Sequence, residues 1–382
     1  MLKRFSISVA ILCILYYVLE WYNGRAQMAD FRVYYDAANA LLHGNTLYGK
    51  AFGVSSGFYK YSPFACIPFI PLAVLPYSIA SVIYYGVTAA AIIFFSVRVS
   101  TYLQGASANQ RLLLPLLAGL FLIDHLEREL HLGNINLLLL IALFETFIAL
   151  KSNQNIRGGV FYGLVLLFKP HFVLLLPYFI WKKRFKTVAA SVASVAFGLF
   201  LPAVALGWKE NMSLLNKWFG AMSDHNLALQ RSPNTIYGLL NNTFLDGQAG
   251  SWLIAVTLLL VAVLVAIFIL RNDRIAGEKW STNLRYQEYF LLIALVPSLV
   301  HTDTEHFMWI WPLLALSIYG LLIKDVKQTR LGIILLALAF IPFAINSPDL
   351  VGNRLQLLFD EGGIGLGNLL IIAAALMVNT RQ

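Results

Sequence analysis

Long apolar runs recur along this chain, and most charged residues lie in short stretches between them. Of the 382 residues, 59% are hydrophobic and 12% are charged, whereas a soluble domain carries about 25% charged residues. Roughly a dozen membrane-spanning helices fit into a chain of this length. The sequence therefore predicts an all-α integral membrane protein. The runs are 5–22, 62–76, 78–98, 111–124, 135–150, 157–168, 171–181, 187–206, 251–270, 286–300, 307–323, 331–345 and 363–378.

Clusters of Lys and Arg between the runs set the expected orientation, because short cytoplasmic loops carry an excess of both residues. Four prolines break the run 62–76, so we interpret it as a juxtamembrane or re-entrant element. The remaining pattern predicts about twelve crossings with both termini in the cytoplasm. The expected cytoplasmic segments are Lys3-Arg4, Arg98 to Arg111, Lys151 to Arg157, Lys182 to Lys186, Arg271 to Arg285, Lys324 to Arg330 and the tail with Arg381.

The expected outer segments include a first outer loop, 23–61, and a long outer loop, 207–250. We expect one membrane-embedded domain over 1–382, since no soluble domain or clear repeat is visible. The net charge of +9 reflects the cytoplasmic clusters and does not indicate a nucleic-acid partner. Cys13 and Cys66 lie in apolar segments, so no disulfide framework is expected.

An acidic residue, Asp30, stands at the start of a predicted helix over 31–43, in the first outer loop. Arg32 precedes Asp36 by four residues, so these two are expected to pair on one helix face. The residue four positions after Asp30 is Tyr34. A carboxylate near a low-dielectric surface is a candidate general base, because desolvation favours its protonation. The structural alternative is that Asp30 is only the N-cap of the helix.

Lys169-Pro170-His171 follows an apolar run too short to span a membrane comfortably. A lysine inside a membrane segment is costly and usually functional, and a lipid phosphate would be a suitable partner for Lys169. His171 is a further candidate binding residue. The alternative is that Lys169 extends its ammonium to the surface.

Other polar groups in the outer segments are weaker candidates. The stretch 301–306 contains two histidines and two carboxylates, but not the helical His spacing of zinc hydrolases. We therefore expect no metal and assign His306 to substrate contact, with a solvated loop as the alternative. Arg231 is a candidate for holding a second anion. Asp124 to His131 is interpreted as a helix end whose charges pair at i,i+4, and Gly133-Asn134-Ile135-Asn136 then opens the next helix.

Several of these stretches together resemble glycosyltransferase family 87, which has the GT-C fold. The resemblance covers the first half of the chain well and the second half more loosely. The family pattern usually has Gln where Asn134 stands and Pro where Ser62 stands. The matching stretches are 30–38 (DFRVYYDAA), 44–48 (GNTLY), 59–64 (YKYSPF), 71–76 (PLAVLP), 133–139 (GNINLLL) and 167–170 (LFKP).

The resemblance implies an inverting enzyme that moves one sugar, usually mannose, from a polyprenyl-phosphate donor to an acceptor hydroxyl of a glycolipid or glycan. It implies that Asp30 is the general base, and a cation such as Lys169 would stabilise the leaving phosphate. Tyr34 and Asn134 are expected to bind substrate. The expected place is the cytoplasmic membrane, with the site on its outer face among membrane lipids. No cofactor is expected, since the sequence has no nucleotide or haem motif.

Two other classes of function remain open from the sequence. One is a transporter or flippase of lipid-linked sugars, although the ionisable residues gather on one face and no inverted repeat is visible. The other is a non-catalytic scaffold of envelope polysaccharide assembly. Only an activity measurement separates the scaffold from an enzyme.

Overall fold

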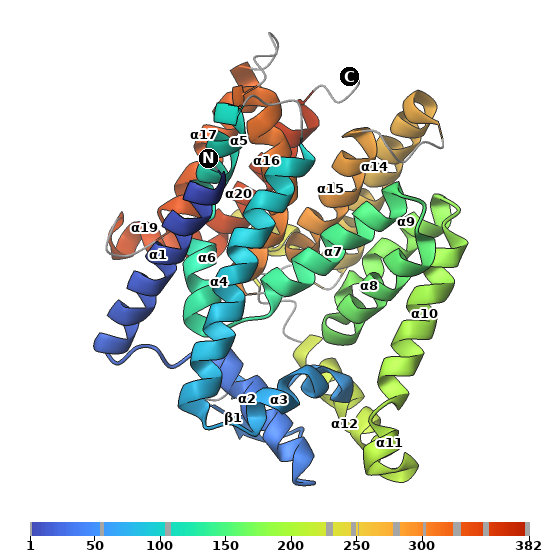
Figure 1. The fold of residues 1–382 in the computed structure, drawn as a ribbon. Coiled ribbons are helices and arrows are strands. Elements are labelled where there is room, and N and C mark those ends of the chain that lie inside the picture. The colour runs from blue at the N-terminus through green and yellow to red at the C-terminus, as the bar shows by residue number, and fades with distance from the viewer. Residues whose placement is uncertain are drawn as a thin grey trace. The chain divides into compact units, whose positions relative to one another are not determined.

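The computed structural model is built almost entirely of helices (Figure 1). It describes residues 2–53, 57–103, 108–226, 232–245, 250, 252–277, 283–300, 303–323, 330–346 and 351–378. Within these residues the strands are β1 (Ala51–Phe52) and β2 (Gly57–Phe58), which pair antiparallel. The predicted all-α class is therefore confirmed. The chain divides into two compact units, and each is described by itself.

The first unit consists of Met1–Leu2, Ser96–Leu126 and Ala228–Gln382, and the second of Lys3–Phe95 and Glu127–Leu227. Helices α1, α4 and α6 contribute residues to both. The helices are α1 (Leu2–Tyr22), α2 (Ala29–Leu42), η1 (Pro63–Phe69), α3 (Ile70–Ala73), α4 (Tyr77–Tyr102), α5 (Ala108–Phe121), α6 (Ile123–Leu132), α7 (Asn136–Lys151), α8 (Asn155–Phe168), η2 (Pro170–Leu175), α9 (Leu176–Trp181), α10 (Phe185–Phe200), α11 (Ala203–Leu206), α12 (Trp208–Asn226), α13 (Ile236–Phe244), α14 (Trp252–Ala276), α15 (Asn283–Leu299), η4 (Thr304–Ile310), α16 (Trp311–Ile318), η5 (Tyr319–Ile323), α17 (Arg330–Ala344), α19 (Asn353–Leu358), η6 (Phe359–Gly363) and α20 (Ile364–Leu376).

Five helical segments among the described residues are long and apolar enough to cross a membrane. A sixth is reached if α6 and α7, bent by 116° against each other, count as one broken span. Other apolar helices, such as Asn155–Phe168 and Arg330–Ala344, are shorter. The predicted number of about twelve crossings therefore stays a prediction. The five segments are Lys3–Tyr22, Tyr77–Tyr102, Phe185–Leu206, Trp252–Ile275 and Thr304–Ile323.

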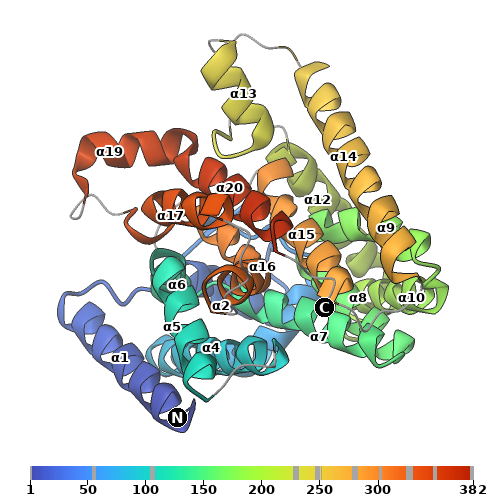
Figure 2. The ribbon, with the colours of Figure 1, turned by 90° about the horizontal axis from the view of Figure 1, so that it is seen from above.

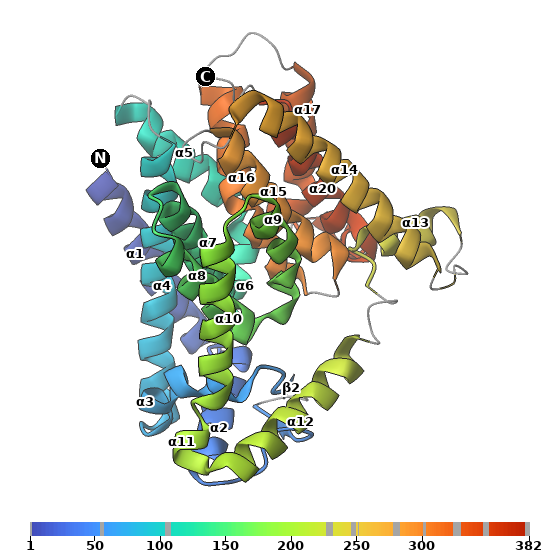
Figure 3. The ribbon, with the colours of Figure 1, turned by 90° about the vertical axis from the view of Figure 1, so that its right-hand side faces the viewer.

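In the second unit, α8 packs closely along α10, with α7 on another side of α8 (Figures 1 and 3). Small residues allow the close approach. A Cβ on Gly159 would lie 2.5 Å from Ala190 Cβ, and one on Gly163 would lie 2.6 Å from Ser194 Cβ. This four-residue spacing of glycines is typical of helix contacts in membrane proteins, where close backbone approach favours association. Residue 169 thus follows directly on a helix, α8, that is closely packed against α10.

Also in the second unit, α2 is amphipathic and buries one face. Phe31 is fully buried and stacks on Tyr84 of α4, with ring centroids 4.5 Å apart. Arg32 pairs with Asp36 at 2.9 Å, which confirms the predicted ion pair. The helix ends at Leu42, and Gly44 has a φ of +66°, the left-handed conformation that suits glycine after a helix. Helix α2 therefore has a fixed orientation on α4.

The Pro-rich segment 62–76 forms only short elements, η1 and α3, and both contact α2. This fits the predicted juxtamembrane or re-entrant element, because η1 and α3 together are too short to span a membrane. Helix α12 also contacts η1, and Trp218 Nε1 donates to the carbonyl of Lys60 at 3.1 Å.

In the first unit, α20 packs against α15, α16 and α17 (Figure 2). The segment Thr304–Ile323 is mostly buried, so it forms the interior of this unit. By contrast, α14 leaves large apolar side chains such as Leu259 and Leu264 exposed, and Trp252–Ile275 has a mean hydropathy of 3.4. An apolar exposed face on a helix of this length suits contact with lipid tails. Cys13 and Cys66 are both free, as predicted.

Candidate active site

Asp30 lies in the first turn of α2, one residue inside the helix. The helix begins at Ala29, and Met28, in the left-handed conformation, is the residue that precedes it. The alternative that Asp30 is the N-cap of this helix is therefore wrong. A carboxylate in the first turn is favoured by the partial positive charge of the helix N-terminus. Asp30 is half-buried, so its carboxylate keeps some access to solvent or substrate.

The side chain of Asn134 joins Asp30 to the rest of the site. Its Nδ2 donates to Asp30 Oδ2 at 2.6 Å. Its Oδ1 accepts from the Ile135 amide at 2.7 Å and from the Tyr34 hydroxyl at 3.2 Å. Because two donors point at Oδ1, the amide nitrogen faces the carboxylate. Asn134 thus holds one oxygen of Asp30 in place.

Tyr34 extends this arrangement towards Tyr61. The two hydroxyl oxygens lie 3.1 Å apart. A hydroxyl has one proton to donate, and Tyr34 gives its proton to Asn134, so Tyr61 is the donor in this second bond. Burial chiefly, and then Tyr61 and Asp30, raises the pKa of Tyr34 well above its usual value. Tyr34 therefore stays neutral and keeps the proton that this arrangement needs.

Lys169 follows α8 and precedes η2, at the break between the two helices. The residue is only 6% exposed, and Nζ lies 5.9 Å from the centre of the Tyr61 ring. That distance is within the range of cation–π attraction. A lysine that extends to the surface would be exposed, so its burial speaks against that alternative.

Ser62 fixes the position of this break. Its buried hydroxyl donates to the carbonyl of Leu167 at 2.6 Å. The bond joins the N-cap of η1 to the last turn of α8, two residues before Lys169. Asp30, Asn134, Tyr34, Tyr61 and Lys169 thus form one connected set, which we call the Asp30–Lys169 network.

His171 and Arg231 are two further residues that the sequence predicts to bind substrate. His171 follows Pro170 in η2, and its ring centre lies 5.5 Å from that of Phe172. Its role in substrate binding stays a prediction. Arg231 lies outside the described residues.

His306 belongs to the first unit and is buried in η4. Its Nδ1 lies 3.0 Å from the carbonyl oxygen of Asp303, and its ring meets that of Trp309 edge to face. Ligand atoms of Asp303, Glu305 and His306 all lie within 4.8 Å of one another, close enough to share an ion. The expectations that no metal takes part and that His306 contacts substrate both stay predictions.

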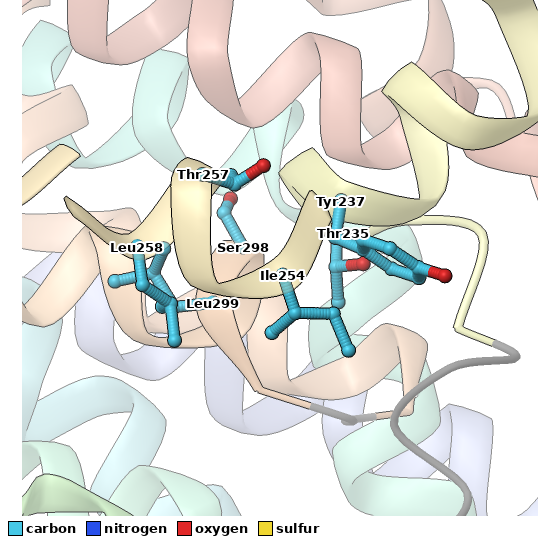
Figure 4. A pocket seen from close by; sticks show the side chains of 7 residues that line it. All are labelled: Thr235, Tyr237, Ile254, Thr257, Leu258, Ser298 and Leu299. Carbon is cyan, nitrogen blue, oxygen red and sulfur yellow. The ribbon is translucent and has the colours of Figure 1, made fainter. Parts of the chain in front are cut away.

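A small pocket in the first unit lies between α13, α14 and α15 (Figure 4). Thr257 and Ser298 place hydroxyls in an otherwise largely apolar lining. None of the predicted site residues lines it. The lining residues are Thr235, Tyr237, Ile254, Thr257, Leu258, Ser298 and Leu299.

Comparison with known proteins identifies the family. The model of glycosyltransferase family 87 matches residues 58–284, which is more than half of the chain. The chain belongs to glycosyltransferase family 87. No solved structure matches it closely.

Two relatives of this family 87 chain are described as polyprenol-phosphate-mannose-dependent alpha-(1-2)-phosphatidylinositol pentamannoside mannosyltransferases. The relative from Mycobacterium tuberculosis is 32% identical over 126 residues, 31% of this chain and 29% of the relative. The relative from Mycolicibacterium smegmatis is 28% identical over 191 residues, 49% of this chain and 44% of the relative. The matches thus span less than half the length of these relatives.

Sequence reasoning did not single out Tyr61 of the Asp30–Lys169 network, nor Glu129 beside it. Tyr61 occurs in the stretch 59–64 that carries the resemblance, but nothing in its spacing pointed to Lys169. Glu129 was interpreted as a partner of His125, whereas its carboxylate accepts from Leu137 N and Asn136 Nδ2 of α7. An acid near the C-terminal end of a helix is disfavoured by its own dipole. The unfavourable position of Glu129 at the end of α6 was therefore the signal in the sequence that its carboxylate binds the next helix.

Proposed function

We propose that the chain is an inverting glycosyltransferase that moves a single mannose from a polyprenyl-phosphate donor to an acceptor hydroxyl. The observation that carries this proposal is the Asp30–Lys169 network, in which a carboxylate and a buried cation are joined through Asn134, Tyr34 and Tyr61. Transfer from a lipid phosphate requires both a base for the acceptor and a cation for the leaving group.

The carboxylate of Asp30 takes the proton of the acceptor hydroxyl. The acceptor oxygen then forms a bond to the anomeric carbon while the bond from that carbon to the phosphate oxygen breaks. The electron pair of the broken bond leaves with the polyprenyl phosphate. A single displacement of this kind inverts the anomeric centre and needs one carboxylate as base.

Asn134 and Lys169 act on the two ends of this reaction. The Asn134 amide stabilises the ionised form of Asp30 and fixes one of its oxygens, so the base is ready before the acceptor binds. Lys169 stabilises the charge that grows on the leaving phosphate, an interaction that strengthens in the transition state. The cation–π contact with Tyr61 holds the ammonium in the same part of the unit.

The relatives act on a phosphatidylinositol mannoside, and we propose a glycolipid or glycan acceptor for this chain as well. We further propose about twelve crossings, with both termini in the cytoplasm and the Asp30–Lys169 network facing the outside of the cytoplasmic membrane. The excess of Lys and Arg in segments such as 182–186 and 324–330 supports this orientation.

The test is incubation of the purified chain, reconstituted in sealed lipid vesicles, with radiolabelled polyprenyl-phosphate mannose and a membrane lipid extract. We expect a labelled lipid or glycan product and free polyprenyl phosphate. The Asp30→Asn variant and polyprenyl-phosphate glucose serve as controls. Donor that moves across a sealed vesicle without product would support a transporter instead, and neither product nor movement would support a scaffold.

A further inference from the structure

The carboxylate of Glu129 is fully buried near the C-terminal end of α6. A carboxylate away from water is costly unless hydrogen bonds satisfy it. Leu137 N donates to Oε1 at 2.8 Å, and Asn136 Nδ2 donates to Oε2 at 3.2 Å. Both donors belong to the first turn of α7, where backbone amides lack partners within the helix and the dipole is positive. The carboxyl group of Glu129 is thus held by the N-terminus of α7.

The residues between α6 and α7 form a sharp elbow of 116°. Gly133 has a φ of +65°, and Asn134 N donates to the carbonyl of Glu129 at 3.2 Å, which closes the end of α6. The hydroxyl of Tyr84 donates to the Asn134 carbonyl at 3.2 Å. Glu129 therefore stabilises the elbow by two kinds of contact. Its backbone carbonyl accepts from Asn134 N, and its carboxylate accepts from the first turn of α7.

The elbow lies directly against the start of α2. A Cβ on Gly133 would lie 2.7 Å from Met28 Cε and 2.8 Å from Phe31 Cβ, so no side chain fits between them. Met28 and Phe31 flank Asp30 in the sequence. A shift of the elbow would therefore move Asn134 relative to Asp30, and a displacement of about 1 Å would break the bond between them.

We infer that Glu129 is a positioning residue for Asp30. Its carboxylate fixes the elbow, and the elbow presents the Asn134 amide to Asp30 Oδ2. This inference rests on the proposed function, because it takes Asp30 as the base. The carboxylate of Glu129 accepts from α7, so we infer that it acts on Asp30 through Asn134.

Kinetics of Glu129→Gln and Glu129→Ala in the full chain test this inference, with polyprenyl-phosphate mannose as donor. Gln keeps one acceptor oxygen for Leu137 N, so it should preserve more activity than Ala. We expect kcat to fall about 10-fold for Gln and more for Ala, while KM for the donor changes less than about 2-fold. Glu127→Gln is the matched control, since Glu127 lies on the same helix and contacts Tyr16 of α1. It should retain wild-type kcat.

A double-mutant cycle separates positioning from general support of the fold. If Glu129 acts through Asn134, Glu129→Gln should lower kcat by less than about 2-fold in an Asn134→Ala background. If the two substitutions lower kcat independently, so that their fold-changes multiply in the double variant, the inference is overturned. A raised donor KM with unchanged kcat would also overturn it.

Hydrogen exchange gives a readout that does not depend on catalysis. Glu129→Gln should speed exchange of the amides of 133–137 and leave those of α10 unchanged. Unchanged exchange at 133–137 would contradict the inference whether or not the chain transfers mannose. A wild-type chain that yields no labelled product would instead contradict the proposed function, so the two failures are distinct.

Discussion

The side-chain amide of Asn134 donates to the carboxylate of Asp30 at 2.6 Å, although 104 positions separate the two residues in the chain. The contact links the first turn of α2 to the elbow between α6 and α7. It places an oriented donor on the proposed base, so the reactivity of Asp30 depends on the position of Asn134.

Replacement of the proposed base should abolish most of the transfer activity. Asp30→Asn keeps the shape of the side chain and removes its basicity, so turnover should fall by about 10²-fold or more. Asp36→Asn is the control on the same helix, since Asp36 pairs with Arg32. It should remain near wild type in the labelled-product assay. Normal turnover of Asp30→Asn, together with loss of turnover in Asp36→Asn, would show that Asp30 is not the base.

Removal of the Asn134 amide should slow transfer without weakening donor binding. Asn134→Leu keeps a similar volume but loses the donor to Asp30, and kcat should fall about 10- to 100-fold. Asn134→Gln keeps an amide and should recover part of the loss. Steady-state kinetics over a range of donor concentrations would measure both effects. Equal activities of the Leu and Gln variants would mean that the amide does not serve the base.

Substitution of Lys169 should affect turnover more than donor binding, because the charge on the phosphate grows as the sugar leaves. Lys169→Ala should lower kcat strongly, and Lys169→Arg should recover part of it. Lys60→Ala is the control, because Lys60 is an exposed lysine between β2 and η1. A Lys169→Gln variant that turns over donor at the wild-type rate would exclude the phosphate role.

The proposed orientation can be measured by cysteine labelling with an impermeant reagent in intact cells. A cysteine at exposed Lys217, in α12 of the predicted outer segment 207–250, should be labelled, and one at Lys183 should not. The native Cys13 and Cys66 are buried and give a low background. The reverse pattern would place the Asp30–Lys169 network on the cytoplasmic face.

The elbow should tolerate no side chain at Gly133. Gly133→Ala places a Cβ within 2.8 Å of Phe31 Cβ at a φ of +65°, so the free energy of unfolding should fall by about 1–3 kcal/mol. Gly86→Ala is the control. Gly86 lies inside α4, and a Cβ added there would have no neighbouring atom within 4 Å. Thermal unfolding in detergent would compare the two. Equal melting temperatures would show that the elbow adapts.

Local patterns in the sequence predicted the local features of this chain. The Arg32–Asp36 pair depends only on helix periodicity, and the apolar runs of α1, α4 and α14 correspond to long helices. The number of crossings could not be settled in this way, since helices that break at Lys169 or bend at Asn134 leave apolar runs of ambiguous length.

The sequence named four residues of the Asp30–Lys169 network as candidates, but it did not name Tyr61 or predict the contacts between them. Asp30, Tyr34, Asn134 and Lys169 were all named from the sequence, and the structure joins them through Tyr61. The contact between Asp30 and Asn134 depends on how α2 packs against a distant elbow, which no local spacing encodes. The partners of Glu129 are nearby in sequence, but a bend of 116° decides which of them its carboxylate reaches.

The long separation between Asp30 and Asn134 also has a consequence for biogenesis. At ordinary rates of translation, the 104 positions between them take about 5–20 s to synthesise. During that interval α1 and α2 leave the ribosome while the elbow does not yet exist. The proposed base therefore gains its oriented donor only after α6 and the start of α7 have been synthesised, so a chain whose synthesis stops earlier carries Asp30 without the Asn134 amide.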